Sequence, residues 1–230
     1  MISNLFRRTY KQRRISKNEI KQKIQALPTS KYDGKYVFHT TNISGLQNIL
    51  KDEYMYSSSK TKKVQLADRP LKKIFMNMLF SPIKLKADPY CVLVFDFQEL
   101  LKHYKIHYSD YAQFGKFEKD SSSYIHTMNN VPDLIKRSKT LKTRRYGNFF
   151  NYTRYYYNMP EIVIHSESIP LKFLKLVIIP ETNLKKIDKS IIEKIKTKYP
   201  HIQFYTKMHG RVLTRSIDVD TVHKLIENKE

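Results

Sequence analysis

Residues 146–180 are the stretch that decides the fold, and they spell YGNFFNYTRYYYNMPEIVIHSESIPLKFLKLVIIP. The stretch begins as an aromatic, basic loop and ends in two apolar runs, residues 162–164 and 173–179. Because β-branched and aromatic residues fill both runs, and Ser-Glu-Ser and proline separate them, we predict two strands. Glu161 therefore lies at the mouth of a buried strand, directly after a loop of stacking side chains. This is a favourable place for chemistry on a ligand with flat rings.

Cationic residues lead into the aromatic loop over residues 136–145. Cations that follow a phosphate backbone, next to rings on which bases stack, are typical of surfaces that bind single-stranded nucleic acid. We therefore predict that six residues contact a nucleic acid or another acceptor: Arg144, Arg145, Phe149, Tyr152, Arg154 and Tyr155. The alternative is that the tyrosines are half-buried residues of packed strands.

The composition favours one domain with a basic extension. A chain of 230 residues with 40% hydrophobic residues can form one core, so we expect a domain over residues 31–230 and a basic arm or helix over residues 1–30. Lys and Arg exceed Asp and Glu by 43 − 21 = 22, which favours polyanionic partners such as nucleic acid or an anionic membrane face. Richness in Lys, Ile, Asn, Tyr and Phe is also typical of AT-rich genomes, such as those of large DNA viruses, some bacteria and their phages. Codon usage can therefore account for part of the charge.

Cysteine, histidine and apolar patterns exclude several classes of protein. The single cysteine, Cys91, lies in an apolar run, so we predict a buried thiol and neither a disulfide framework nor a cysteine-based zinc site. His103 and His107 have helical i, i+4 spacing, but no further ligands accompany them, so no metal is expected. No apolar run approaches the roughly 20 residues that span a bilayer, and the N-terminus lacks the apolar core of a signal peptide. We expect a soluble, intracellular protein of the cytoplasm or nucleus.

The N-terminal part of the domain carries a second informative pattern. Residues 36–41 alternate as a strand after the Asp33-Gly34 turn, Asn42 can cap a helix over residues 43–51, and a short strand follows over residues 54–58. Elsewhere the patterns predict helices over residues 71–79, 98–104, 187–199 and 219–226, and strands over residues 91–95 and 202–205.

The order of three short motifs resembles the ADP-ribosyltransferase superfamily. The motifs are His39-Thr40-Thr41, then Tyr54-Met55-Tyr56-Ser57, and finally Pro160-Glu161-Ile162-Val163-Ile164 with the Ile169-Pro170 segment after it. The resemblance covers residues 35–180 and is closest to the DarT-like DNA ADP-ribosyltransferases, whose catalytic Glu also opens a strand that a similar Ile/Val-Pro segment follows. It implies an α+β fold with a split β-sheet core and flanking helices.

The resemblance also implies a site that uses NAD as a substrate and holds no metal. Glu161 would be the catalytic residue. The residues expected to bind NAD are His39 at the adenosine ribose, Thr40 at the nearby backbone turn, Tyr56 and Ser57 at the nicotinamide, and Arg69 as the candidate for the family's NAD-binding arginine.

We therefore expect an NAD-dependent mono-ADP-ribosyltransferase with a nucleic-acid or protein acceptor. Met159 stands where the arginine-specific members carry Glu or Gln, which argues against protein arginine as the acceptor. One alternative is a catalytically silent nucleic-acid-binding protein on the same scaffold, with a steep salt dependence and no need for NAD. Another is an RNA 2′-phosphotransferase, which the chain resembles less because that enzyme relies on a His and several Arg rather than a Glu. A nuclease is disfavoured because no cluster of carboxylates for Mg²⁺ is present.

Overall fold

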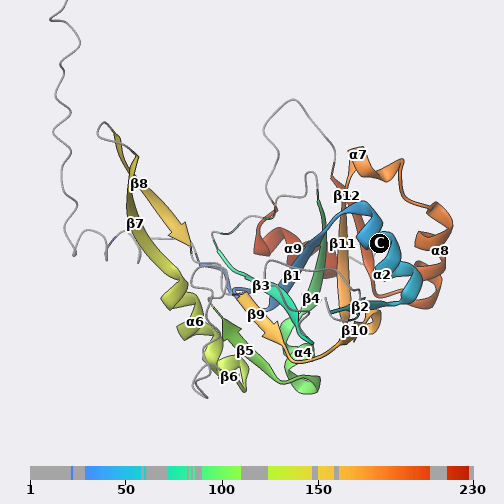
Figure 1. Cartoon of the computed structure of the whole chain (residues 1–230), viewed down its shortest axis with the longest axis horizontal. Coiled ribbons are helices and arrows are strands. Elements are labelled where there is room, and N and C mark those ends of the chain that lie inside the picture. The colour runs from blue at the N-terminus through green and yellow to red at the C-terminus, as the bar shows by residue number, and fades with distance from the viewer. Residues whose placement is uncertain are drawn as a thin grey trace, which may run out of the picture.

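The computed structural model describes residues 22, 29–57, 60, 72–81, 83, 85, 90–109, 124–146, 150–157, 161–207 and 217–227 (Figure 1). Most of the basic arm expected over residues 1–30 lies outside the described residues, and so do the predicted site residues Arg69 and Phe149.

A central sheet of eight strands organises the described part of the chain (Figure 1). Its strands, in spatial order, are β12 (Gln203–Lys207), β11 (Leu174–Pro180), β4 (Cys91–Asp96), β1 (Tyr36–Thr41), β3 (Ile74–Leu79), β9 (Glu161–Ile164), β5 (Ile106–Ser109) and β6 (Tyr124–Ile125). Neighbouring strands are antiparallel except for β11 and β12, which are parallel. The strand that begins with Glu161 thus lies between β3 and β5.

Two further pairs of strands stand apart from this sheet. The strands β2 (Tyr54–Tyr56) and β10 (Ser168–Pro170) form one antiparallel pair. The strands β7 (Lys139–Tyr146) and β8 (Phe150–Tyr157) form a hairpin that projects from the sheet (Figure 1). The predicted α+β class with flanking helices is confirmed.

Helices cover the strands and connect them. The α-helices are α2 (Ile43–Asp52), α4 (Phe97–His103), α6 (Val131–Ser138), α7 (Glu181–Leu184), α8 (Lys189–Lys198) and α9 (Val219–Glu227), and the 3₁₀ helices are η2 (Met128–Asn130) and η3 (Leu171–Phe173). The predicted cap of α2 is present, because Asn42 Oδ1 accepts a 2.7 Å hydrogen bond from the N–H of Gly45. Asp96 and Asp188 cap α4 and α8 in the same way.

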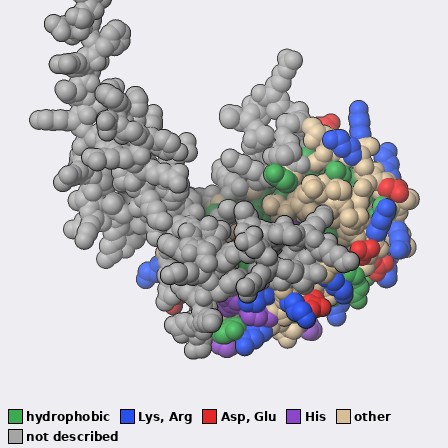
Figure 2. All heavy atoms as spheres, in the orientation of Figure 1, with side chains coloured by type: hydrophobic (Ala, Val, Ile, Leu, Met, Phe, Trp, Pro, Cys, Tyr) green, Lys and Arg blue, Asp and Glu red, His purple; other side chains and the backbone are tan. Residues whose placement is uncertain are grey.

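The core consists of the apolar strands and the helix faces that pack on them. Residues 91–95 of β4 are fully buried, and the thiol of Cys91 is free, as predicted. On α8, Ile191, Ile192 and Ile195 face the core. The opposite face of this helix is polar, and Figure 2 shows Lys and Arg side chains along the edge of the molecule that α7 and α8 form. This distribution is that of an amphipathic helix that covers a sheet.

Two local predictions are wrong, each because strand pairing overrides a local pattern. Residues 74–79 form β3 rather than part of a helix, since pairing with both β1 and β9 outweighs the helix propensity of Met and Leu. The aromatic, basic loop is the β7–β8 hairpin, in which each tyrosine of β8 has a direct partner on β7. The helix predicted over residues 98–104 is α4, which ends at His103, and His107 lies on β5.

Candidate functional site

A pocket lies where β1, β2 and the beginning of β3 come together. Seven residues line it: His39, Met55, Tyr56, Ser57, Lys73, Ile74 and Phe75. Three of these, His39, Tyr56 and Ser57, are residues that the sequence resemblance associates with NAD. Residues that lie up to 36 positions apart in the chain thus meet in one cavity.

The pocket exists because β1 and β3 pair over only part of their length. Their register covers Tyr36, Val37 and Phe38, whose partners are Leu79, Met78 and Asn77. His39, the next residue of β1, instead contacts β3 through its side chain, with Nδ1 3.1 Å from the carbonyl oxygen of Phe75. On the other side, the N–H of Ser57 donates a 2.9 Å hydrogen bond to the carbonyl of Glu167. This bond continues the β2–β10 pairing by one residue past Tyr56.

The contact with Phe75 fixes the chemical character of His39. A carbonyl oxygen can only accept, so Nδ1 of His39 carries the proton and donates it. Burial lowers the pKa of His39, partly opposed by this hydrogen bond, so the ring is neutral near pH 7. Nε2 is then the unprotonated nitrogen. His39 can therefore accept a hydrogen bond at Nε2, as from a sugar hydroxyl.

Tyrosine rings and a buried serine border the pocket on the β2 side. Tyr56 stacks on Tyr54, with ring centroids 5.9 Å apart, and Lys60 Nζ lies 4.7 Å from the Tyr56 centroid. Ser57 is only 2% exposed. Thr40, which follows His39 on β1, is exposed and does not line the pocket.

Glu161 is close to this pocket in the sheet but is not part of its lining. It is half-buried as the first residue of β9, where it pairs with Asn77 on β3 and with Ser109 on β5. Asn77 in turn pairs with Phe38, the residue before His39. Two strand spacings therefore separate Glu161 from β1, about 10 Å. Since side chains alternate along a strand, an ideal pleat directs His39 and Glu161 to opposite faces.

A second acidic residue, Glu167, contacts the pocket residue Ser57 through its backbone and was not predicted as a site residue. Its backbone carbonyl is the one that Ser57 contacts, and its Oε1 lies 3.1 Å from Nζ of Lys72. The Ser-Glu-Ser segment was predicted only as the break between two strands. The sequence could have pointed to Glu167, because it is a charged residue in a break between two strands. Residues in such breaks lie at the ends of strands, where functional sites often form.

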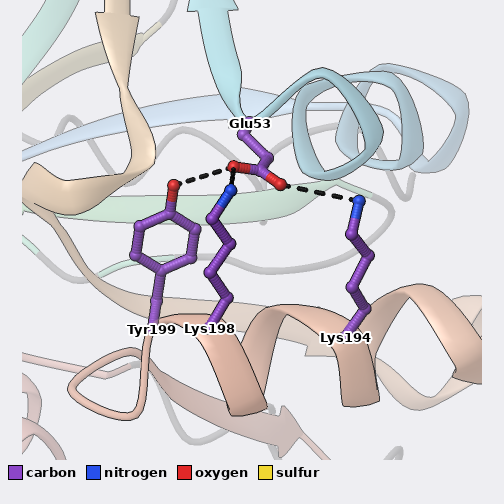
Figure 3. A network of polar contacts seen from close by, with 4 residues as sticks. All are labelled: Glu53, Lys194, Lys198 and Tyr199. Atoms are coloured by element: carbon purple, nitrogen blue, oxygen red, sulfur yellow. Dashed lines mark hydrogen bonds and ion pairs between the residues drawn. The ribbon is translucent and has the colours of Figure 1, made fainter.

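The turn that leads into β2 is held by a polar cluster around Glu53 (Figure 3). Glu53 adopts a left-handed conformation with φ of 61° after α2. Its carboxylate accepts a 2.9 Å hydrogen bond from the Tyr199 hydroxyl, pairs closely with Lys198 and lies 3.5 Å from Nζ of Lys194. The hydrogen bond from Lys198, followed by that from Tyr199, lowers the pKa of Glu53. The cluster anchors the start of β2, and with it Tyr56 and Ser57, to α8.

The hairpin divides the residues predicted to contact an acceptor. Arg144 pairs directly with Tyr152, and Arg154 pairs with residue 142, two positions from Arg144. These three residues therefore lie on one face of the ribbon. Arg145 and Tyr155 lie on the other face, because they pair with residues 151 and 141.

Two features are absent from the described part of the chain. No group of three or more His, Cys, Asp or Glu that could hold a metal ion occurs among them. Within the same residues, no helix combines the length and the apolar character needed to cross a membrane.

Comparison with known proteins finds similarity at the level of structure. No protein-family model and no curated protein sequence matches the chain. DarT from Thermus sp. 2.9 in complex with carba-NAD+ is similar, with a TM-score of 0.45 and 10% identity over 77% of this chain and 96% of that one. The complex of the same protein with NAD+ gives 0.43 and 12% over 76% and 96%. Its complex with ADP-ribosylated ssDNA gives 0.46 and 12% over 80% and 97%.

Proposed function

We propose that this protein is an NAD-dependent mono-ADP-ribosyltransferase that modifies nucleic acid. The observation that carries the proposal is the convergence of His39, Tyr56 and Ser57 on one pocket. These residues come from two of the three motifs in which the sequence resembles ADP-ribosyltransferases. Motifs that match by chance have no reason to meet in a cavity.

Individual residues of the pocket offer contacts that parts of a dinucleotide use. His39, neutral and with Nε2 unprotonated, accepts a hydrogen bond from a ribose hydroxyl. The Tyr56 ring offers a stacking surface for the nicotinamide, with Ser57 beside it. We assign Thr40 to the turn next to the ribose and Arg69 to a further contact with NAD.

Glu161 is our candidate for the catalytic carboxylate. When the bond between nicotinamide and ribose breaks, nicotinamide takes the electron pair and positive charge develops at C1′. A carboxylate near that carbon stabilises the charge electrostatically and can accept the proton of the attacking group. Glu161 lies about two strand spacings from β1 and, on an ideal pleat, on the face opposite His39, so the assignment requires a substrate that reaches it past the point where β1 and β3 separate.

The acceptor is assigned to the hairpin. Arg144 and Arg154, with Tyr152 on the same face of the ribbon, combine cations for phosphates with a ring for stacking. A net charge of +22 favours the same class of acceptor. Arg145, Tyr155 and Phe149 are assigned to the same surface on sequence grounds alone.

The test is incubation with NAD labelled in its adenylate phosphate, with single-stranded DNA, RNA and cell-extract protein offered in parallel. The wild type is compared with Glu161→Gln and Glu167→Gln, which remove one charge each without changing side-chain size. We expect label on nucleic acid with the wild type and with Glu167→Gln, and none with Glu161→Gln. Full activity of Glu161→Gln would refute the catalytic assignment, and label confined to protein would refute the acceptor class.

A second function has one observation in its favour. Glu161 does not line the pocket that contains His39. A protein without catalytic activity would not need a carboxylate there. Such a protein would bind nucleic acid with a steep salt dependence and would neither release nicotinamide nor transfer label. Absence of both products from the wild type, together with tight salt-sensitive binding, would establish this alternative.

A further inference from the structure

Four exposed lysines lie around the junction of α2, α7 and α8, and we call them the junction lysines. They are Lys51 in the last turn of α2, Lys185 and Lys186 between α7 and α8, and Lys189 at the start of α8. The helices α2 and α8 pack together, and Nε2 of Gln47 donates a 3.0 Å hydrogen bond to the backbone carbonyl of Lys186. Two segments that are distant in the chain thus form one surface.

The carboxylate of Asp188 shows how close the two segments are. Hydrogen bonds from the side chain and the backbone of Ser190 lower the pKa of Asp188, and the charge of Lys51 lowers it further. Lys51 on α2 is therefore near the start of α8. The carboxylate itself caps this helix, with Oδ1 2.9 Å from the backbone nitrogen and 2.7 Å from Oγ of Ser190. Residues 51–52 and 185–189 together contain four lysines against Asp52 and Asp188, so the surface is positive.

The junction lysines differ from the lysines further along α8 in having no acidic partner. Lys194 and Lys198 pair with Glu53, and Lys196 pairs with Glu193. None of the junction lysines forms an ion pair with another residue that the structure describes. Their charges are therefore available to an external anion.

The surface around the junction lysines is charged without being apolar. The apolar residues of α8, namely Ile191, Ile192 and Ile195, are buried in the core. In the described part of the chain, the exposed large hydrophobic side chains are Tyr54 and Tyr90, and neither belongs to α2, α7 or α8. Helices that bind a membrane surface also insert apolar side chains, which favours the phosphate backbone of a nucleic acid as the partner here.

We propose that the junction lysines form a second nucleic-acid-binding surface, which contacts the phosphate backbone of the strand that carries the acceptor nucleotide. Figure 1 shows α2 and α8 on the opposite side of the central sheet from the β7–β8 hairpin. The helix α7 packs on β11 and β12, and five strand spacings, about 24 Å, separate β12 from β9, the strand that follows the hairpin. Lysine ammonium groups suit this role because phosphate contacts position a strand without reading its sequence. The assignment adds a remote contact to the proposed function and rests on that function for the identity of the strand as an acceptor.

The test is binding of the full chain to single-stranded DNA of about 25 nucleotides, which spans both surfaces at about 3.4 Å per nucleotide, followed by fluorescence anisotropy at several salt concentrations. One variant combines Lys51→Gln, Lys185→Gln, Lys186→Gln and Lys189→Gln. The control combines Lys31→Gln, Lys102→Gln, Lys172→Gln and Lys224→Gln, which remove the same charge from exposed lysines elsewhere on the molecule. Thermal melting establishes that both variants are folded, and sedimentation with vesicles that contain phosphatidylserine tests a membrane as the partner.

We expect the junction variant to bind DNA about tenfold more weakly than the wild type, and its slope of log affinity against log salt to become shallower by up to about 2.8, since each phosphate contact with a single strand contributes about 0.7. The control variant should stay within about threefold of the wild type, because charges more than about 8 Å from a phosphate are screened at physiological salt.

Three results would overturn this assignment. They are an equal loss of affinity in the control variant, an unchanged affinity in the junction variant, and vesicle binding that depends on the junction lysines while DNA binding does not. DNA binding that depends on the junction lysines, in a wild type that transfers no label from NAD, would refute the proposed function and leave this surface standing.

Discussion

Acid should destabilise this protein through His107, which is buried against His165. The pKa of His107 is lowered from 6.5 to about 4 by burial first, and then by His165, Lys73 and Lys105. The folded protein therefore keeps this ring neutral down to about pH 4, whereas the unfolded chain takes up a proton near pH 6.5. Between these values the unfolded state binds more protons, so the free energy of unfolding falls as the pH falls.

The size of the effect follows from the two pKa values. Their difference, about 2.5, corresponds to about 3.4 kcal/mol when the pH is well below both values. Integrated between pH 8 and pH 5, the contribution of His107 is about 2 kcal/mol. A loss of this size is a large share of the 5–15 kcal/mol by which proteins of ordinary stability resist unfolding.

Urea unfolding at pH 8, 6.5 and 5 measures this contribution. His107→Leu replaces the titrating ring on β5 with an apolar side chain of similar size. Between pH 8 and pH 5, the free energy of unfolding of this variant should therefore fall by about 2 kcal/mol less than that of the wild type. The pKa of His165 is also lowered, so His165 supplies part of the dependence that remains. His126→Leu replaces an exposed histidine next to β6 and is the control that should keep the wild-type pH dependence. An identical pH dependence of the wild type and His107→Leu would refute this reasoning.

Three further predictions concern the parts of the fold that support the pocket. Glu53→Gln should lower the free energy of unfolding, measured by urea titration, by about 1 kcal/mol, because it removes the charge that Lys194, Lys198 and Tyr199 contact. The control is Glu193→Gln, which affects only an exposed pair with Lys196 and should change the free energy of unfolding by no more than about 0.5 kcal/mol. Gly45→Ala should destabilise the protein by about 1–3 kcal/mol, since a Cβ would lie 2.2 Å from Oγ1 of Thr41. Adding Thr41→Ala should restore much of the lost melting temperature, and a Gly45→Ala variant as stable as the wild type would contradict this contact. Cys91 should react with a thiol reagent such as DTNB only after unfolding in urea, because the thiol is fully buried and burial raises its pKa to about 11; rapid labelling of the folded protein would show that β4 is accessible.

Local patterns were sufficient to predict several elements of this protein. The alternation over residues 36–41, the cap at Asn42 and the unbroken apolar run after Cys91 each describe how a few consecutive residues meet water or the core. Such patterns depend on side-chain period and hydrogen-bonding groups that lie within one turn or strand. The buried thiol followed from them, whereas the α+β class was what the family resemblance implied.

The arrangement of the site depended on strand pairing, which consecutive residues do not specify. The residues of β3 have strong helix formers among them, and they form a strand because β1 and β9 flank them. The aromatic segment before Glu161 is a hairpin, whose register separates Arg144 from Arg145. Sequence patterns alone could not supply either result, since a register joins positions far apart in the chain.

The sequence by itself determined which residues to examine at the pocket, namely His39, Tyr56 and Ser57, because their order along the chain matches a known pattern. Only the tertiary structure decided that they meet, that Lys73 joins them, and that Glu161 lies about two strand spacings from β1. The physical reason is that β1 and β3 separate after Phe38 while β2 pairs with β10, and both events depend on packing between segments that are distant in sequence.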